Sequence, residues 1–512
     1  MSNVLDEIIE GVEPWPGVVS VMAGARMPVL LALDIGTSGI RAALFDETGR
    51  EIAGTNIRSD HNSATSDWAT FDAEILLDQV ASTLSVVLEN IPVAVTSIEY
   101  IAISCFWHSL MGVNERGHPT TPVFSWADSR AIAASSQLRS EFDEVVTHAR
   151  TGCRFHPSYW PAKLRWLRSE QPEVFGATKL WLSFADYIAY QLFDEPVTSV
   201  SMASGTGLLN QLTCEWDKEL LAALGITTSN LPEVAGPDRQ LPKLTATCAE
   251  LWPQLSAARL FPAVGDGAAN SIGSGCHSTE RVSLMVGTSG AMRVSFMGEP
   301  PAQIPPELWC YRASRERIVI GGALSDGGGL YHWIKETLLF DRFPDELESE
   351  LELLEPDGHG LTILPFWTGE RSTGWNPNAR GAILGLSKQT RGTEILRAAI
   401  EAVAYRFALI AKALEPFAPN ALLVASGHAL RSSPTWIQIL ADVIGRPVAL
   451  TEASEASLRG AALLALEAAG KIQSVAELSV PVETAFEPNM THHVRYREAL
   501  ERQEQIYKRL LT

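Results

Sequence analysis

The sequence has few cysteines, no cysteine pair and no long apolar run. Its six cysteines are scattered and form no Cys-x-x-Cys motif, which argues against a zinc site or a disulfide framework and fits a reducing compartment. No stretch reaches the roughly 18 to 20 apolar residues that a membrane-spanning helix needs. The acidic opening segment does not resemble a signal peptide. We therefore expect a cytoplasmic protein without a membrane partner, with residues 1–28 as an N-terminal extension.

Basic residues are also scarce. Forty Lys and Arg residues face sixty Asp and Glu residues, which gives a formal net charge of −20. A nucleic-acid-binding surface needs a basic face to neutralise phosphates, so we expect no nucleic-acid partner. An anionic ligand would have to be held by local backbone amides, arginines or a metal ion. At 512 residues the chain is too long for one core, so two domains are expected.

Two similar segments lie about half the chain apart. In the first, an apolar strand over residues 29–33 leads through Asp34 into a Gly-Thr-Ser-Gly turn at 36–39, and a second strand follows over 41–46. In the second, a strand over 282–286 leads into the same four residues at 287–290, and a strand follows over 291–296. An internal repeat of this size predicts two related domains that face one another.

The rest of the chain alternates strands and helices, which is typical of an α/β fold. We expect further strands at 100–104 and 422–425. We expect helices at 161–167, 185–192, 394–414, 436–444 and 457–469. The last of these is rich in small residues and could therefore pack closely against another element. Residues 266–279 are the candidate crossing between the domains.

The Gly-Thr-Ser turns are candidate phosphate-binding loops. Glycines let backbone amides approach a phosphate closely, and the hydroxyl groups add donors. Arg41 and Arg293 follow the two turns and can add positive charge. The alternative is that both turns are merely tight hairpins, which is less plausible for two turns in the same context. The predicted phosphate contacts are Gly36, Thr37, Ser38, Arg41, Gly287, Thr288 and Ser289.

Two aspartates are candidates for metal binding and catalysis. Asp34 precedes the first turn, where a carboxylate would repel phosphate unless Mg²⁺ lay between them. The alternative is that Asp34 caps the turn. Asp266 stands between two glycines after an apolar segment and could take the proton from an attacking hydroxyl group while also binding the metal. The alternative is that Asp266 is the N-cap of a helix that begins at Ala268.

These motifs together resemble those of the FGGY carbohydrate kinases, from Val29 along nearly the whole chain. The resemblance rests on segments 34–41, 265–267, 287–289, 364–371, 375–381 and 426–428. It implies two actin-like ATPase (ribonuclease H-like) domains facing a central cleft. The first, residues 29–272, would bind the sugar and carry the first phosphate motif and the catalytic Asp266. The second, residues 273–512, would bind the nucleotide. ATP and Mg²⁺ are the implied cofactors, and domain closure would exclude water.

The same resemblance implies further site residues. On the nucleotide side they are Gly328, His332, Gly427, His428 and Ser433. Two positions depart from the family pattern, because His428 stands where a second glycine is usual and Arg41 where many members have lysine. On the substrate side they are His108, Trp126, Asp128 and Asp266. Alternatives remain for three of these: His108 as a structural residue, Trp126 in the core, and Asp128 in a local salt bridge with Arg130.

Three segments, 156–164, 202–209 and 369–378, are more similar to the gluconokinase-like members than to others. Phe106 and Trp107 are bulkier than the residues those members have before the substrate-facing histidine, and a larger residue in a pocket can change which sugar is admitted. Gluconate is the first expected substrate, followed by xylulose, ribulose or another pentose or polyol. The alternative of another class is an actin-like ATPase or sensor without sugar transfer. A homodimer is compatible with the sequence.

Overall fold

The structure is a computed structural model that describes residues 27–52, 54–61, 69–236, 239, 243–338, 344–478, 480–483 and 485–511. The expected N-terminal extension therefore lies almost entirely outside the described residues. The first strand begins at Met27, two residues before the expected start of the folded region. No helix among the described residues is long and apolar enough to cross a membrane.

The N-terminal half of the molecule (residues 27–273) is built on a six-stranded sheet. Its strands are β1 (Met27–Ile35), β2 (Gly39–Phe45), β3 (Ile57–Asp60), β5 (Val95–Cys105), β13 (Arg259–Leu260) and β14 (Val264–Gly265). The first three strands form an antiparallel meander, and β5 pairs in parallel with β1. Strands β13 and β14 pair in parallel with the far side of β5.

The C-terminal half (residues 281–511) repeats this topology. Its sheet contains β15 (Arg281–Val286), β16 (Gly290–Met297), β17 (Trp309–Arg312), β18 (Arg317–Leu324), β21 (Leu422–Ser426) and β22 (Val448–Leu450). Strands β15, β16 and β18 form the antiparallel meander, while β21 and β22 add in parallel beside β15. The shared strand order confirms the internal repeat and the α/β class that the sequence predicted.

Helices and short strands complete both halves. The N-terminal half adds α1 (Ala73–Glu89), α2 (Ile132–Glu141), α3 (Glu144–Thr151), α4 (Trp160–Glu170), α5 (Pro172–Ala177), α6 (Phe184–Phe193), α7 (Val200–Ser204), α8 (Lys218–Leu224), α9 (Ala246–Leu251), α10 (Asp266–Gly273), β4 (Thr70–Phe71), β6 (Met111–Val113), β7 (Val123–Phe124), β8 (Leu180–Leu182), β9 (Val197–Ser199), β10 (Leu209–Asn210), β11 (Glu215–Trp216) and β12 (Glu233–Ala235). The C-terminal half adds α11 (Gly328–Thr337), α12 (Pro344–Leu353), α13 (Gly392–Leu414), α14 (His428–Arg431), α15 (Pro434–Ile444), α16 (Ala456–Ala468), α17 (Met490–Leu511), β19 (Thr362–Leu364) and β20 (Ala382–Leu384). All five predicted helices are present.

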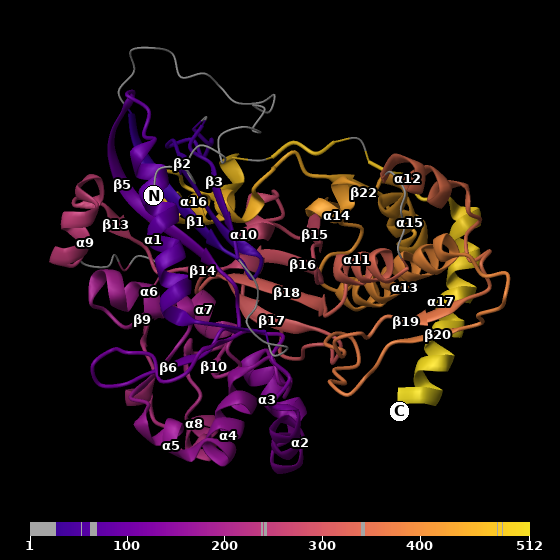
Figure 1. The fold of residues 1–512 in the computed structure, drawn as a ribbon, viewed down its shortest axis with the longest axis horizontal. Coiled ribbons are helices and arrows are strands. Elements are labelled where there is room, and N and C mark those ends of the chain that lie inside the picture. Colours follow the sequence, from indigo (N-terminus) through magenta and orange to yellow (C-terminus); the bar gives the residue numbers. More distant parts are fainter. Residues whose placement is uncertain are drawn as a thin grey trace.

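Helix α16 joins the two halves, as its small residues suggested. It lies beside β1 and β2 although it is more than 400 residues away in sequence (Figure 1), and it packs so closely on α10 that the two helix backbones nearly touch. A Cβ placed on Gly460 would lie 1.8 Å from the carbonyl oxygen of Ala269, and one placed on Gly273 would lie 1.7 Å from that of Ala456. Because α10 begins with Asp266, this contact fixes the helix that carries the candidate base.

A second contact joins the halves at β17. The amide of Cys310 donates to the carbonyl oxygen of Gly152 at 2.9 Å, and a Cβ on Gly152 would collide with that same residue. The rings of Trp309 and Tyr311 stack at 4.1 Å, and both contact Trp107 of the N-terminal half. Aromatic side chains from both halves therefore share one core beside Asp266.

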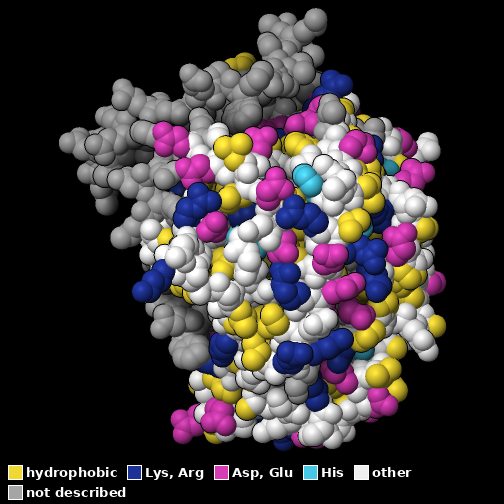
Figure 2. Space-filling model, turned by 90° about the vertical axis from the view of Figure 1, so that its right-hand side faces the viewer, with side chains coloured by type: hydrophobic (Ala, Val, Ile, Leu, Met, Phe, Trp, Pro, Cys, Tyr) yellow, Lys and Arg dark blue, Asp and Glu magenta, His cyan; other side chains and the backbone are white. Residues whose placement is uncertain are grey.

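The surface carries charges of both signs. On the face shown in Figure 2, Lys and Arg side chains are interspersed with Asp and Glu side chains, and no continuous basic area covers the described residues of that face. This distribution agrees with the acidic composition of the chain. A phosphate-binding site in this protein must therefore be assembled locally.

The contact between α10 and α16 gives a stability prediction. We expect Gly460→Ala to lower the free energy of unfolding by about 1–3 kcal/mol, because the added methyl group must push two helix backbones apart. Gly176→Ala is the matched control, since nothing lies within 4 Å of a Cβ at that helical position, and we expect its effect to stay within about 1 kcal/mol. Thermal melting of both variants measures the difference. Equal melting temperatures would contradict the close packing.

Candidate active site

The first glycine turn is a tight hairpin with an exposed tip. The amide of Gly36 donates to the carbonyl oxygen of Gly39 at 3.0 Å, which closes the turn between β1 and β2. His61 supports it from outside, with its Nε2 2.9 Å from the carbonyl oxygen of Gly36. Thr37 and Ser38 are exposed at the tip. The turn is thus a hairpin, as the alternative stated, but one that leaves its hydroxyl groups available to a ligand.

The second glycine turn lies against the start of α11. The amides of Gly327 and Gly329 both donate to the carbonyl oxygen of Thr288, at 3.0 and 2.9 Å. The amide of Gly328 donates to the carbonyl oxygen of Gly287 at 2.8 Å. Side chains at these glycines would collide with the turn, because a Cβ on Gly328 would lie 2.7 Å from the Gly287 carbonyl oxygen. The structure therefore brings Gly328 next to the predicted phosphate loop, and His332 lies exposed one turn further along α11.

The predicted adenosine-side loop lies beside the same turn. Gly427 adopts φ +100°, and a Cβ there would lie 2.4 Å from the carbonyl oxygen of Val286, the residue before the second turn. His428 begins α14, and its side chain is outside the described part of the chain. Ser433 is the N-cap of α15 and donates to Glu348 Oε2 at 2.8 Å. A nucleotide contact for Ser433 stays a prediction.

Asp34 is a buried carboxylate held by side chains. Its Oδ1 accepts a hydrogen bond from Ser104 Oγ at 2.7 Å, and its Oδ2 lies 3.3 Å from Arg41 Nη1. Burial raises the pKa of Asp34 to about 6, and the negative charges of Asp266 and Glu455 also raise it, against the lowering effects of Ser104 and Arg41. These bonds go to side chains rather than to the turn. A buried carboxylate whose pKa is raised in part by a second carboxylate, Asp266, is an arrangement that a divalent cation stabilises.

Asp266 is the first residue of α10, and Gly265 is its N-cap. The alternative in which Asp266 caps a helix beginning at Ala268 is therefore wrong. The Oδ1 atom of Asp266 accepts hydrogen bonds from the amides of Gly267 at 2.7 Å and Trp107 at 3.4 Å. Burial raises the pKa of Asp266, while the Arg293 guanidinium and the two amides lower it.

Trp107 explains why glycines flank the aspartate. A Cβ on Gly265 would lie 1.9 Å from Trp107 Cε2, and one on Gly267 would lie 2.6 Å from its Cζ3. The indole Nε1 donates to the carbonyl oxygen of Ser201 at 2.9 Å, and the side chain is 5% exposed. The bulk of Trp107 is therefore accommodated by these glycines, and its effect on which sugar is admitted stays a prediction.

Arg293 brings positive charge from the C-terminal half to this aspartate. Its Nη1 lies 3.3 Å from the carbonyl oxygen of Gly267, and it has the largest charge effect on the pKa of Asp266. Arg41 is the second residue after the first glycine turn, whereas Arg293 is the third residue after the second turn. Because side chains alternate along a strand, the two arginines occupy different faces of the two hairpins, and only Arg41 contacts Asp34.

On the substrate side, His108 is buried and neutral. Its backbone adopts φ +69°, and its Nδ1 donates to the carbonyl oxygen of Gly205 at 2.5 Å. Burial lowers the pKa of His108 to about 3, helped by the charges of Arg371 and Lys163. With the proton on Nδ1, Nε2 is the acceptor. The ring meets Tyr159 and Tyr311 edge-on at 5.1 and 5.6 Å.

Trp126 and Asp128 have different environments. Trp126 is half-buried, and the Arg371 guanidinium lies 4.2 Å from the centre of its ring, so it is not simply a core residue. Asp128 is buried and binds Arg130 with both oxygens. The local salt bridge given as the alternative for Asp128 is therefore present, and a substrate contact for Asp128 stays a prediction.

Sequence reasoning missed four side chains of this region as site residues. Arg371 reaches from the C-terminal half to Trp126. The hydroxyl groups of Tyr159 and Tyr311, one from each half, are 2.5 Å apart. Lys163 is buried with its Nζ donating to the carbonyl oxygen of Ser158, and burial lowers its pKa to about 7. The contacts of Arg371, Tyr159 and Tyr311 join residues far apart in the chain, whereas Lys163 bonds to a residue close by in sequence. The signal for Arg371 was its place in the segments 364–371 and 369–378.

A cluster of three metal-ligating side chain types is separate from this site. Asp357, His359 and Glu401 could geometrically hold a metal ion, but Glu401 already accepts hydrogen bonds from Arg397, His359, Tyr405 and Tyr496, and Asp357 binds Arg502. This cluster therefore has the partners of a structural network.

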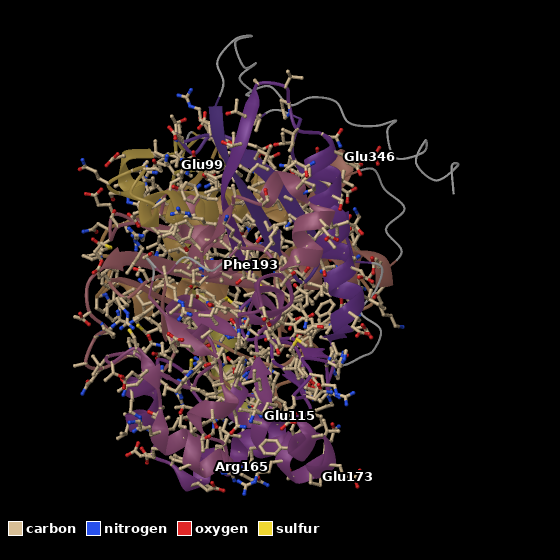
Figure 3. The ribbon with its side chains drawn as sticks, turned by 90° about the vertical axis from the view of Figure 1, so that its left-hand side faces the viewer. Glu99, Glu115, Arg165, Glu173, Phe193 and Glu346 are labelled. Carbon is tan, nitrogen blue, oxygen red and sulfur yellow. The ribbon has the colours of Figure 1, made fainter. Side chains whose placement is uncertain are left out.

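An open groove of about 500 Å³ is lined by Asn114, Glu115, Arg116, His118, Gly176, Ala177, Thr178 and Lys179. It contains no candidate catalytic residue. Figure 3 shows Glu115 at the opposite end of the N-terminal half from Glu99.

Comparison with known proteins agrees with this geometry. Residues 29–273 match the N-terminal domain, and residues 282–469 the C-terminal domain, of the FGGY family of carbohydrate kinases. The chain is 28% identical over 473 residues to a gluconokinase of Bacillus subtilis (strain 168), covering 89% of this chain and 91% of that protein. It is 30% identical over 478 residues to a glycerol kinase of Polaromonas naphthalenivorans (strain CJ2), covering 88% and 93%.

Solved structures show the same two-domain architecture. The gluconate kinase from Lactobacillus acidophilus superposes with a TM-score of 0.85 at 26% identity, covering 94% of this chain and 98% of that chain. A ligand-bound xylulose kinase from the same organism gives the same values. These matches confirm the expected pair of actin-like ATPase domains. The chain belongs to the FGGY family of carbohydrate kinases and is a phosphotransferase.

Proposed function

We propose that this kinase transfers the γ-phosphoryl group of ATP to a hydroxyl group of a sugar acid, with gluconate as the first candidate. The observation that carries the proposal is the position of Asp266, which contacts the N-terminal half through the Trp107 amide and lies beside Arg293 of the C-terminal half. The gluconokinase relatives support the choice of gluconate. Xylulose, ribulose and other polyols are the alternative acceptors, as xylulose and glycerol kinases are also similar.

Asp266 would act as the general base. Both backbone amides bond to its Oδ1 atom, so Oδ2 can accept the proton of the attacking hydroxyl group. A carboxylate whose pKa is raised by burial is a stronger base than one in water. Arg293 would stabilise negative charge as the phosphoryl group moves. We further propose that the sugar-binding domain spans residues 29–272 and the nucleotide-binding domain residues 273–512.

The two glycine turns would hold the phosphates, with Gly36, Thr37, Ser38 and Arg41 on one side and Gly287, Thr288 and Ser289 on the other. Gly328, His332, Gly427, His428 and Ser433 are the proposed contacts to the rest of the nucleotide. On the sugar side, His108 Nε2 would accept a hydrogen bond from a substrate hydroxyl group, with Trp126 and Asp128 nearby.

Asp34 pairs with Ser104 of β5, and Gly265, the residue before Asp266, pairs with Cys105 of the same strand, so the two carboxylates stand at one edge of the sheet and fit a Mg²⁺ ion. Burial is the main cause of the raised pKa of Asp34, and the charge of Asp266 adds to it. When bound there, Mg²⁺ would neutralise phosphate charge beside these carboxylates. The chain's own residues position both aspartates, through Ser104 for Asp34 and through Gly267 for Asp266.

Replacing the base should separate binding from chemistry. We expect Asp266→Asn to lower kcat by about 10²–10⁴-fold, because the amide cannot accept the hydroxyl proton, while a non-hydrolysable ATP analogue binds with little change. Coupled detection of ADP and calorimetric titration measure the two quantities. Asp78→Asn is the control, since Asp78 lies on the exposed face of α1. An Asp266→Asn variant with wild-type turnover would overturn the assignment of the base.

The acceptor is identified by ADP release with single sugars. We expect release to be slow with ATP and Mg²⁺ alone, because water is a poor acceptor in a closed site, and to rise strongly with gluconate. Xylulose, ribulose, glycerol and glucitol complete the panel. ADP release that no sugar changes would contradict sugar transfer and favour an ATPase or sensor.

The metal assignment is tested at Asp34. We expect chelation of Mg²⁺ to abolish turnover and Asp34→Asn to raise the Mg²⁺ concentration needed for half-maximal activity by about tenfold, as one of two carboxylates is lost. Titrating Mg²⁺ at saturating ATP measures this requirement. An unchanged requirement in the variant would place the metal elsewhere.

A further inference from the structure

Arg371 is a buried cation without a close ion-pair partner, although the charges of Asp266 and Asp326 act on it from further away. Its side chain is 8% exposed, and among the described residues no carboxylate lies within 4.0 Å of its guanidinium. Its Nη2 donates to the carbonyl oxygen of Leu324 at 2.9 Å, but its Nε has no hydrogen-bond partner. Burying a charge without a partner is costly. The protein therefore holds at this position a guanidinium that is ready to receive an acceptor.

Trp375, one turn further along the same segment, has a second unused donor. Its ring is 1% exposed, and its Nε1 is buried without a hydrogen-bond partner. The amide of Trp375 donates to the carbonyl oxygen of Arg371 at 2.7 Å, which keeps the two residues together. The ring of Trp375 lies 6.2 Å from that of Tyr159. The positive charge of Arg371 also acts on Tyr159, so both unused donors lie in the surroundings of one tyrosine.

These donors belong to the sugar side of the site rather than to the phosphate side. Tyr159 contacts His108, and Arg371 lies over the half-buried ring of Trp126. By contrast, Arg293 follows the second glycine turn and has the larger charge effect on Asp266, with Arg371 the weaker of the two. The two buried arginines therefore divide the site, with Arg293 near the phosphates and Arg371 near the far part of the acceptor.

We propose that Arg371 and Trp375 bind the carboxylate of a sugar-acid substrate, and that Arg371 determines the preference for sugar acids over neutral sugars. A carboxylate offers two planar acceptors that match the guanidinium fork, and it supplies an anion at ion-pair distance. Desolvated donors also reject a ligand that lacks the acceptor, because they are then left unpaired. This inference rests on the proposed kinase function.

The test compares gluconate with glucitol, which has a neutral hydroxymethyl group in place of the carboxylate. We expect the wild-type enzyme to prefer gluconate in kcat/KM by about 100-fold or more. Arg371→Met should lower kcat/KM for gluconate by about 100-fold, mainly through KM, and leave that for glucitol within about threefold. Arg371→Lys keeps the positive charge but not the forked guanidinium geometry, so its kcat/KM for gluconate should lie between those of the wild type and of Arg371→Met. Trp375→Phe should lower kcat/KM by about tenfold for gluconate and not for glucitol.

Two further measurements keep the outcome clear. Calorimetric titration of gluconate without nucleotide should show the same loss of affinity, while an ATP analogue binds each variant as it binds the wild type. Arg495→Met is the matched control, because Arg495 on α17 forms an exposed ion pair with Glu355. We expect this variant to behave as the wild type. Thermal melting checks folding, and if Arg371→Met does not fold, Arg371→Lys and Trp375→Phe are judged by the same ratio.

The possible failures are distinguishable. An equal loss for gluconate and glucitol in Arg371→Met would overturn the specificity role while leaving the kinase assignment intact. A wild-type enzyme that phosphorylates neutral sugars but no sugar acid would also overturn this inference alone. A wild-type enzyme that phosphorylates none of them contradicts the proposed function, and the inference with it.

Discussion

The structure depends on holding one buried carboxylate where the two halves of the chain meet. Asp266 begins a short helix whose backbone touches α16 of the C-terminal half, at the pair of glycines Gly273 and Gly460. The same carboxylate accepts hydrogen bonds from the amides of Trp107 and Gly267, and Arg293 is the positive charge that lowers its pKa most. A carboxylate in such surroundings stays available as a base only if both halves keep their places. The close helix contact and the shared aromatic core at β17 provide that constraint.

Charge is assembled locally because the chain as a whole repels anions. With a net charge of −20, the overall field would not attract ATP or a sugar acid. The structure concentrates buried guanidinium groups around Asp266 instead, with Arg293 on the side of the glycine turn and Arg371 on the side of the aromatic residues. Neutral His108 adds an acceptor without adding charge. Two buried guanidinium groups therefore act on the base in an otherwise acidic protein.

Much of the fold was predictable because it depends on local sequence. Apolar runs that end in glycine turns defined β1 and β15, and the repeated motif predicted the repeated sheet, although β5 extends over 95–105 rather than 100–104. The start of α10 at Asp266 rather than Ala268 was missed, because the glycines on both sides of Asp266 give no clear signal of where the helix begins. Arg371, Trp375 and Tyr311 were missed as site residues because their contacts cross between the two halves. They lie in strands and loops whose pattern shows nothing of the contacts they make across the two halves.

A crystal structure with a non-hydrolysable ATP analogue, Mg²⁺ and gluconate tests the central claim most directly. The account predicts a γ-phosphate between the two glycine turns, with the acceptor hydroxyl group within hydrogen-bond distance of Asp266 Oδ2. A sugar bound away from Asp266, or a triphosphate that contacts only one of the two turns, would contradict it.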